Sequence, residues 1–474
     1  MGIATINPAT GETLKTFEPL SEEALDEKIA RASAAWGSYR LTAPEQRADW
    51  LRTAAEALEA DADSVAELMT TEMGKTLVSA KAEVGKCVKG LRWYAEHGAR
   101  FLEVEPRPAE AVGAEVAYVT YQPIGVVLAI MPWNFPLWQA VRFAAPALMA
   151  GNVGLLKHAS NVPQTALYLE ELFRRAGFPD AAFQTLLIGA GTVERVLRDD
   201  RVAAATLTGS NAAGRAVAAV AGDVLKKTVM ELGGSDPFIV MPSADLDRAA
   251  DVAVTARCQN NGQSCIAAKR FLVHADVAEE FTRLFAQKLG ALTVGDPMAE
   301  STQVGPLATE SGLEDVERYV ADAVDKGATV VVGGKRPDGP GWFFEPTLLT
   351  GVTSEMAMHH EEVFGPVAAL YSVESLDEAL EIANSHIYGL GSNLWSEDES
   401  ERQQFVRDIA SGMAFINGMV ASYPELPFGG VKQSGYGREL TELGMREFMN
   451  AKTVWIGPSN GGPGTGVTAG SAAE

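Results

Sequence analysis

The sequence predicts an α/β fold in which two parallel sheets are covered by helices. Two series of short apolar runs alternate with helix-like segments, one over residues 125–234 and one that begins at residue 237. Such alternation is typical of parallel strands that are buried on both faces. The length of 474 residues agrees with this, since roughly 150 residues per domain gives two or three domains. In sheets of this kind, ligands bind beyond the carboxyl ends of the strands.

The composition indicates a globular protein with a large core and a net acidic charge. Hydrophobic residues make up 47% of the chain and charged residues 21%, which is an ordinary balance. The net charge of −23 argues against nucleic-acid binding, because such proteins present a basic face. A small anionic ligand is compatible with this charge where local cations hold it.

Cysteine content and hydropathy predict a cytoplasmic location. Cys87, Cys258 and Cys265 form no CxxC pair and no histidine completes a metal set with them, so no metal site is predicted. So few cysteines in a long chain favour a reducing compartment. Residues 1–15 lack the apolar stretch of a signal peptide, and no apolar run reaches the roughly 18 residues that predict a membrane span.

Most of residues 1–105 are predicted to be helical. In the segment 42–62, Thr42 is the predicted N-cap, with Pro44 in the first turn and Glu45 at the spacing of a capping box. Apolar residues then recur at helical spacing, at Trp50, Leu51, Ala54, Ala55 and Leu58.

The first alternating series predicts a nucleotide-type sheet. Its strand-like runs lie at residues 125–131, 153–158, 183–189, 202–209 and 227–234. After the fourth run, Gly209 and Ser210 open a helix whose backbone N–H groups favour an anion, although a tight turn with an N-cap serine fits equally well. The motif GAGTVE at 189–194 follows a strand and is similar to half of a dinucleotide fingerprint, but the third glycine is missing, so a short glycine-rich turn is favoured over contact with phosphate.

The second series predicts a separate sheet with strand-like runs at residues 237–241, 271–274, 328–334, 367–373 and 414–417. Five polar or glycine-rich motifs stand along both series: MPWNFP, MELGG, NNGQSC, EEVFGPV and PFGGVKQSGYGRE. In this order they resemble the aldehyde dehydrogenase superfamily, and within it the bacterial succinate-semialdehyde dehydrogenases of the NADP type. The resemblance covers roughly residues 5–456. It implies a Rossmann-type cofactor domain, an α/β catalytic domain and a small bridging β ribbon.

The resemblance implies a cofactor domain of residues 1–105 and 124–232, a catalytic domain of residues 233–432, and bridging segments at 106–123 and 433–457. The ribbon would pair AEVAYVTYQP with AKTVWIG. An exposed apolar strand edge favours pairing between subunits, so a homodimer or homotetramer is expected. The Gly-, Ser- and Pro-rich residues 458–474 predict a disordered tail.

The resemblance assigns the chemistry to three residues. The Cys265 thiolate would attack the aldehyde and form a thiohemiacetal. The Asn134 side-chain amide, with the Cys265 N–H, would stabilise the oxyanion, and Glu231 would activate water for thioester hydrolysis. A structural thiol at Cys265 is the alternative that the other motifs disfavour, and a surface carboxylate at Glu231 is disfavoured by the glycines after it. Cys87 and Cys258 are interpreted as structural.

Cofactor contacts are implied by the resemblance at Trp133, Asn134, Lys157, Gly209, Ser210, Leu232, Glu362 and Phe364. Lys157 would bind the adenosine ribose and Glu362 the nicotinamide ribose. Three residues after the lysine, NAD-preferring members commonly carry a glutamate, which would repel a 2′-phosphate. Ser160 stands there instead and can donate a hydrogen bond to phosphate. NADP is therefore the expected cofactor, with NAD as the alternative.

The expected substrate is a small anionic aldehyde, bound by Trp138, Arg142 and Ser422. In a helix, Trp138 and Arg142 would be i,i+4 neighbours on the face of Asn134. The related branch carries an arginine at this spacing that binds the substrate carboxylate, whereas the alternative for Arg142 is a structural ion pair with an acidic neighbour. A further arginine of some members, six residues before the cysteine, is Gln259 here.

The predicted function is oxidation of succinate semialdehyde to succinate. The first alternative is a dehydrogenase for another small aldehyde, or one that releases an acyl-CoA; Glu231 argues against acyl-CoA release, because acylating relatives generally lack that base. The second alternative is a catalytically silent binding protein on the same fold, which intact Asn134, Glu231 and Cys265 disfavour.

Overall fold

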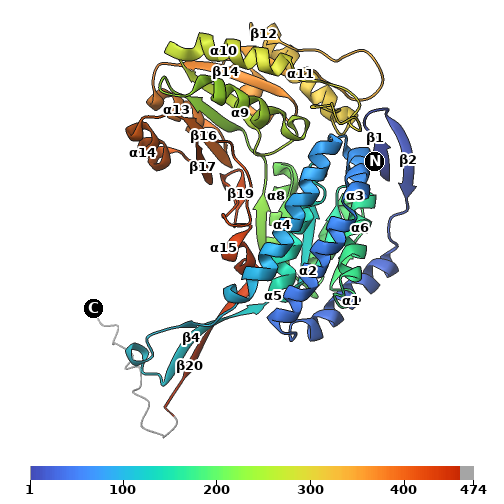
Figure 1. Ribbon diagram of the computed structural model, residues 1–474. Coiled ribbons are helices and arrows are strands. Elements are labelled where there is room, and N and C mark those ends of the chain that lie inside the picture. The colour runs from blue at the N-terminus through green and yellow to red at the C-terminus, as the bar shows by residue number, and fades with distance from the viewer. Residues whose placement is uncertain (1, 459–474) are drawn as a thin grey trace.

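The computed structural model describes residues 2–458 of the chain. Two α/β lobes, each built around a mainly parallel sheet, lie one above the other in Figure 1, and a long β ribbon extends from the lower one. Residues 459–474 of the predicted tail lie outside the described residues. Among the helices of the described part, none combines the length and the apolar character needed to cross a membrane.

The first sheet has six strands in the order β19–β9–β8–β5–β6–β7. The strands are β5 (Val126–Met131), β6 (Val153–His158), β7 (Phe183–Thr185), β8 (Val202–Thr208), β9 (Lys227–Glu231) and β19 (Gly435–Tyr436). All run parallel except β19, which pairs antiparallel with β9 at the edge. The five parallel strands fall within the runs that the sequence predicts, and their burial is that of strands enclosed by helices.

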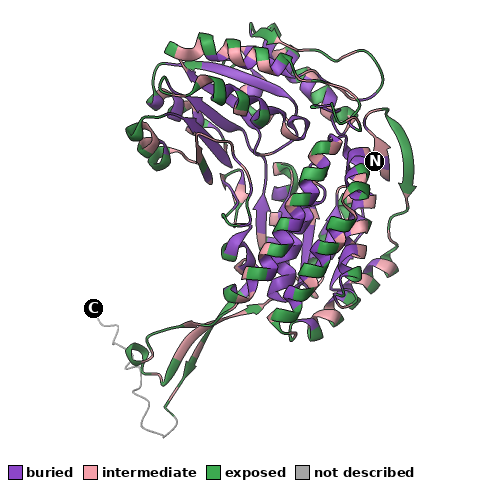
Figure 2. Ribbon diagram, in the orientation of Figure 1, coloured by how far each residue is buried: buried purple, intermediate pink, exposed green. Residues whose placement is uncertain are grey.

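Eight helices of residues 2–223 pack around this sheet and build the first core: α1 (Glu22–Tyr39), α2 (Pro44–Ala60), α3 (Ala62–Met73), α4 (Leu77–Phe101), α5 (Trp138–Ala150), α6 (Pro163–Arg175), α7 (Val193–Arg198) and α8 (Asn211–Asp223). α5 is buried along its whole length, because it packs on the strands and is covered by α2 and α4. Figure 2 shows that buried residues follow the sheets and the inner faces of the helices.

The start of α2 differs from the prediction. Its N-cap is Ala43 and not Thr42, whose hydroxyl donates to the Tyr39 carbonyl instead. Pro44 explains the difference, since a proline in the first helical position holds the residue before it in an extended conformation. Ala43 has that conformation, with φ −64° and ψ 143°.

The second sheet has seven strands in the order β12–β13–β14–β11–β10–β16–β17, all parallel except the pair β12–β13. They are β10 (Asp236–Val240), β11 (Ala268–His274), β12 (Thr329–Val332), β13 (Thr347–Thr350), β14 (Val367–Val373), β16 (Gly391–Trp395) and β17 (Met413–Ile416). The helices packed on it are α9 (Leu246–Cys258), α10 (Ala275–Gly290), α11 (Glu310–Asp325), α13 (Leu376–Ser385) and α14 (Glu399–Asp408).

Apart from strands of two residues, two strands and one hairpin have no counterpart in the sequence prediction. β13 and β16 are short, and their sequences TLLT and GSNLW mix polar with apolar residues. The hairpin is the N-terminal one of β1 (Ile3–Asn7) and β2 (Glu12–Phe17), in which β2 is largely exposed. Polar or exposed strands lack the apolar run by which buried strands are predicted.

The ribbon consists of β4 (Val116–Pro123) and β20 (Met449–Ile456), which pair antiparallel along their whole length, with β3 (Glu105–Pro106) at the edge of β4. This pairing is the one that the sequence predicts. Val116, Trp455 and Ile456 are exposed on it. The remaining short elements are α12 (Ala357–His360), α15 (Thr441–Arg446), β15 (Tyr388–Gly389) and β18 (Val431–Lys432).

Candidate active site

Residues from four of the five motifs line one cavity beyond the carboxyl ends of β5, β8 and β9. The cavity measures about 290 Å³. Its lining residues are Pro132, Trp133, Asn134, Thr208, Gly209, Ser210, Leu232, Gly233, Cys265, Glu362 and Phe364. Since this is the edge at which open α/β sheets bind ligands, the cavity is the candidate active site.

The loop that carries Cys265 is held in a conformation few sequences could adopt. After α9, Asn260, Asn261 and Gly262 all have positive φ, between 54° and 75°. Asparagine and glycine tolerate this region best, which explains the sequence NNG. The Asn261 amide donates to the carbonyls of Gly74 and Pro306 at 2.8 and 2.9 Å. A side chain at Gly262 would collide with the backbone at Gly365, so the loop is fixed on both sides.

Lys269 fixes the cysteine itself, although it belongs to none of the five motifs. Its Nζ donates to the carbonyls of Ser264 and Cys265 at 2.8 and 2.6 Å and to Glu362 Oε1 at 3.2 Å. Burial raises the pKa of the Cys265 thiol to about 12, and the positive charge of Lys269 opposes this shift. The side chain keeps partial solvent access, so the thiol is reachable from the cavity.

Asn134 is positioned to donate into the cavity. Its side-chain Nδ2 donates to the Gln263 carbonyl at 3.2 Å. Its main-chain carbonyl accepts from Asn260 Nδ2 at 2.7 Å. Both contacts tie Asn134 to the cysteine loop. Nδ2 carries two hydrogens and only one is engaged by a described residue, so the second is available to an oxyanion formed next to Cys265.

Replacement of Asn134 by alanine is expected to lower kcat by about 10²–10³-fold, because one oxyanion donor is removed. The measurement is steady-state turnover of an aldehyde together with the Kd for the cofactor, which should change little. A loss confined to KM, with kcat preserved, would contradict the assignment of the amide to the oxyanion.

Glu231 ends β9 as a buried carboxyl group. Neither of its carboxyl oxygens has a hydrogen-bond partner among the described residues. Burial raises its pKa well above the usual range and the charge of Glu439 adds to this, whereas Arg142 and Arg438 oppose it. A Cβ on Gly429 would lie 2.8 Å from Glu231 Oε1, so only glycine leaves this carboxyl its space. A carboxyl group with a raised pKa is suited to accept a proton near neutral pH.

A second cavity of about 320 Å³ lies on the other side of the N-terminus of α8. It is lined by Ile130, Lys157, Ala190, Gly191, Val193, Glu194, Leu197, Leu207, Ala213, Ala216, Val217 and Val220. Lys157 makes no ion pair within residues 2–458, and burial lowers its pKa. Four residues of the motif GAGTVE, namely Ala190, Gly191, Val193 and Glu194, line this cavity.

At the N-terminus of α8, the expectation that the Gly209 N–H faces an anion is wrong. The Gly209 N–H donates to the Glu231 carbonyl at 3.0 Å, so it is not available to an anion. Ser210 is the N-cap of α8, and its Oγ accepts from the Ala213 N–H at 3.4 Å. Gly209 therefore contributes space in the cavity lining, and an anion at this helix end would have to bind N–H groups of the turn that follows.

The two cavities together fit a dinucleotide. They lie on either side of a helix N-terminus, which suits a pyrophosphate. Lys157, which has no ion-pair partner within residues 2–458, lines the second cavity. In the active-site cavity Glu362 lies against Gly233, and a Cβ added to Gly233 would be 2.6 Å from Glu362 Oε2. Phe364 packs edge-on against Trp133 with ring centroids 5.7 Å apart. Ser160 lies two residues beyond β6, and its carbonyl accepts from the Ala4 N–H.

The three expected substrate residues lie in one region, but their contacts differ from the prediction. Trp138 Nε1 donates to Ser422 Oγ at 3.0 Å. Arg142 forms a buried ion pair with Glu439, which is the alternative that the sequence leaves open. α5 begins at Trp138, so Asn134 precedes the helix and does not share its face. Contact of Arg142 with a substrate carboxylate stays a prediction.

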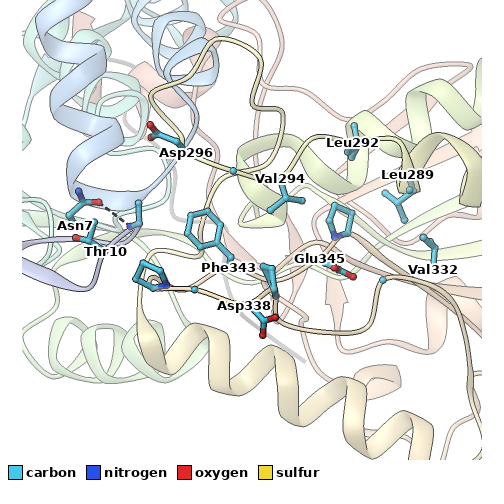
Figure 3. Close-up of a pocket in the computed structure, with 18 residues that line it drawn as sticks. Asn7, Thr10, Leu289, Leu292, Val294, Asp296, Val332, Asp338, Phe343 and Glu345 are labelled. Atoms are coloured by element: carbon cyan, nitrogen blue, oxygen red, sulfur yellow. Dashed lines mark hydrogen bonds between the residues drawn. The ribbon is translucent and has the colours of Figure 1, made fainter.

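A larger cavity of about 890 Å³ lies elsewhere, between the turn after β1 and the loops around β12 and β13 (Figure 3). Its charged lining residues are Asp296, Asp338 and Glu345. These carboxylates would repel a dinucleotide or an anionic substrate. None of the five motifs reaches this cavity, so it is not the candidate active site.

Comparisons with known proteins identify the family of the chain. The model of the aldehyde dehydrogenase family matches residues 1–454. An NADP(+) succinate-semialdehyde dehydrogenase of Mycobacterium avium is 62% identical over 467 residues, covering 98% of this chain and 99% of its own.

Solved structures give the same likeness. The succinic semialdehyde dehydrogenase of Streptococcus pyogenes, in complex with NADP+, matches with a TM-score of 0.93 at 38% identity and covers 96% of this chain and 100% of its own. The succinate-semialdehyde dehydrogenase of Burkholderia pseudomallei matches with a TM-score of 0.93 at 36% identity, covering 97% and 95%. The predicted fold class is confirmed by these matches.

Proposed function

Because the chain belongs to the aldehyde dehydrogenase family, we propose that it oxidises succinate semialdehyde to succinate and uses NADP as hydride acceptor. The observation that carries this proposal is the full-length likeness to NADP(+) succinate-semialdehyde dehydrogenases. The site supports it, because Cys265 and Asn134 line one cavity and Glu231 ends the strand that reaches it.

In the proposed mechanism the Cys265 thiol gives up its proton to solvent water, and its sulfur bonds to the aldehyde carbon. The carbonyl oxygen becomes an oxyanion and accepts hydrogen bonds from Asn134 Nδ2 and the Cys265 N–H. NADP, when bound, supplies the hydride acceptor. Loss of the hydride leaves an acyl thioester on Cys265. Glu231 takes a proton from the water that attacks the thioester, which releases the acid and restores the cysteine.

A panel of aldehydes tested with both cofactors decides between this function and its alternatives. The expected result is the highest kcat/KM with succinate semialdehyde and NADP, and no requirement for coenzyme A. A higher kcat/KM for a neutral aldehyde, or product formed only with coenzyme A, would assign the enzyme to another branch of the family. A protein that binds NADP and oxidises no aldehyde would support the silent alternative.

The preference for NADP is proposed to depend on Lys157 and Ser160. Lys157 supplies a positive charge that has no ion-pair partner within residues 2–458, and a hydroxyl stands at 160 where a glutamate would repel a 2′-phosphate. The change Ser160→Glu is expected to reverse the preference, since a charge-assisted hydrogen bond corresponds to roughly ten- to a hundredfold in affinity. The measurement is kcat/KM with NADP and with NAD.

Ser160→Ala is the matched control for that change. It should weaken the binding of NADP without creating a preference for NAD, because it removes the hydroxyl and adds no charge. A wild-type protein with higher kcat/KM for NAD would show that the proposed preference is wrong.

Two further proposals concern the assembly and the location of the enzyme. The exposed apolar side chains of the ribbon suit a contact with a second copy of the chain, as a homodimer or homotetramer. The three cysteines are free, which suits the reducing conditions of the cytoplasm.

A further inference from the structure

One cation of α4 lies against two of the three residues expected to bind the substrate. Lys86 Nζ donates to Ser422 Oγ at 2.6 Å and lies 4.8 Å from the ring centroid of Trp138. Trp138 Nε1 donates to the same hydroxyl at 3.0 Å. Three segments that are distant in the sequence therefore converge on one hydroxyl group, and one of them brings a positive charge.

Lys86 has no carboxylate within ion-pair distance among residues 2–458, in contrast to its neighbours on the same helix or just before it. Lys89 pairs with Glu425 and Lys81 with Asp63. Lys75, which is fully buried, pairs with Glu83.

The other charged side chains around Lys86 are already matched within residues 2–458. The carboxylate of Glu83, besides its pair with Lys75, accepts from the N–H groups of Leu137 and Trp138 at the start of α5. The guanidinium of Arg142 pairs with Glu439. Burial and the charge of Arg142 lower the pKa of Lys86 to about 8, so the ammonium group is destabilised as it stands and an anion beside it would relieve this.

Ser422 can donate a hydrogen bond to an anion that lies beside Lys86. Its oxygen accepts two hydrogen bonds, from Lys86 and from Trp138, so its own hydroxyl hydrogen is left to donate. An ammonium and a hydroxyl at adjacent positions suit the two oxygens of a carboxylate. An uncharged ligand end would leave the Lys86 charge unmatched in a partly buried place, which is unfavourable.

We propose that Lys86, together with the Ser422 hydroxyl, binds the carboxylate of the substrate and thereby selects aldehydes that carry an acid group at the far end. This rests on the proposed function. Lys86 would supply the charge that Gln259 does not supply, whereas the charge of Arg142 is balanced by Glu439 before any substrate binds.

The test compares wild type with Lys86→Met on two substrates, succinate semialdehyde and butanal, at saturating NADP. Methionine keeps the length and packing of the side chain and removes the charge. The ratio of kcat/KM for succinate semialdehyde to kcat/KM for butanal is expected to fall by at least about tenfold, mainly through KM. Lys86→Arg keeps the charge and should recover part of the ratio.

Lys89→Met is the matched control, since Lys89 is exposed on the same helix and pairs with Glu425; its ratio should equal that of wild type. Equal losses on both aldehydes in Lys86→Met would show that Lys86 only supports the fold, and this would overturn the inference. Unchanged kcat/KM on both aldehydes would overturn it as well and would leave the proposed function standing. Failure of the proposed function is seen separately, as a wild-type protein that does not prefer succinate semialdehyde.

Discussion

Cys265→Ala abolishes aldehyde-dependent NADPH formation and leaves NADP binding intact. The expected loss in kcat is several orders of magnitude, because removal of the nucleophile removes the covalent route and leaves only binding and the oxyanion donors. NADPH absorbance measures the turnover, and a binding titration measures the Kd for NADP. The cavities on either side of the α8 N-terminus do not depend on the sulfur, so that Kd should change little.

Cys258→Ala is the matched control. Cys258 is buried at the end of α9, and burial raises its thiol pKa to about 12, as for Cys265. It does not line the active-site cavity. Its removal should preserve turnover, and equal loss of activity in both variants would mean that the cysteine loop, and not the Cys265 sulfur, is what the reaction requires.

Glu231→Gln is expected to release a single burst of NADPH, about one per active site, followed by almost no steady-state turnover. Acylation and hydride loss need Cys265 and Asn134, whereas hydrolysis of the thioester needs a proton acceptor, which glutamine is not. Rapid-mixing absorbance at the NADPH band measures the burst and the later rate. Wild-type steady-state turnover in this variant would show that the base is another group.

The pH dependence of wild-type turnover follows from the same carboxyl group. Burial and the charge of Glu439 raise the pKa of Glu231, so the group keeps its proton to a higher pH than an ordinary glutamate. Only the ionised form accepts a proton from water, and deacylation is therefore expected to accelerate as pH rises through that pKa.

The reacting residues could be predicted from the sequence because their signals are local. The cysteine loop needs two asparagines and a glycine with positive φ, and these stand next to one another in NNGQSC. Glu231 ends an apolar strand and Asn134 stands shortly after another, so their place at the sheet edge follows from the strand pattern. The ribbon was expected from the family resemblance, which implies that AEVAYVTYQP pairs with AKTVWIG.

What could not be predicted depends on contacts between distant segments. Nothing near Arg142 in the sequence identifies Glu439 as its partner, and nothing in the charged helix α4 distinguishes Lys86 from Lys89. The two lysines differ in their partners, because Ser422, far along the chain, places its hydroxyl beside Lys86, whereas Lys89 pairs with Glu425. The N-cap at Ala43 shows the same limit on a small scale, because the constraint from Pro44 outweighs the better capping side chain of Thr42.

The mass of the intact Glu231→Gln protein after incubation with NADP and succinate semialdehyde tests the central claim most directly. The account predicts the addition of one succinyl group, which peptide mapping places on Cys265 and hydroxylamine removes, as expected for a thioester. The same incubation of Cys265→Ala should leave the mass unchanged. An unmodified Glu231→Gln protein that nevertheless produces NADPH, or a succinyl group on a residue other than Cys265, would contradict the account.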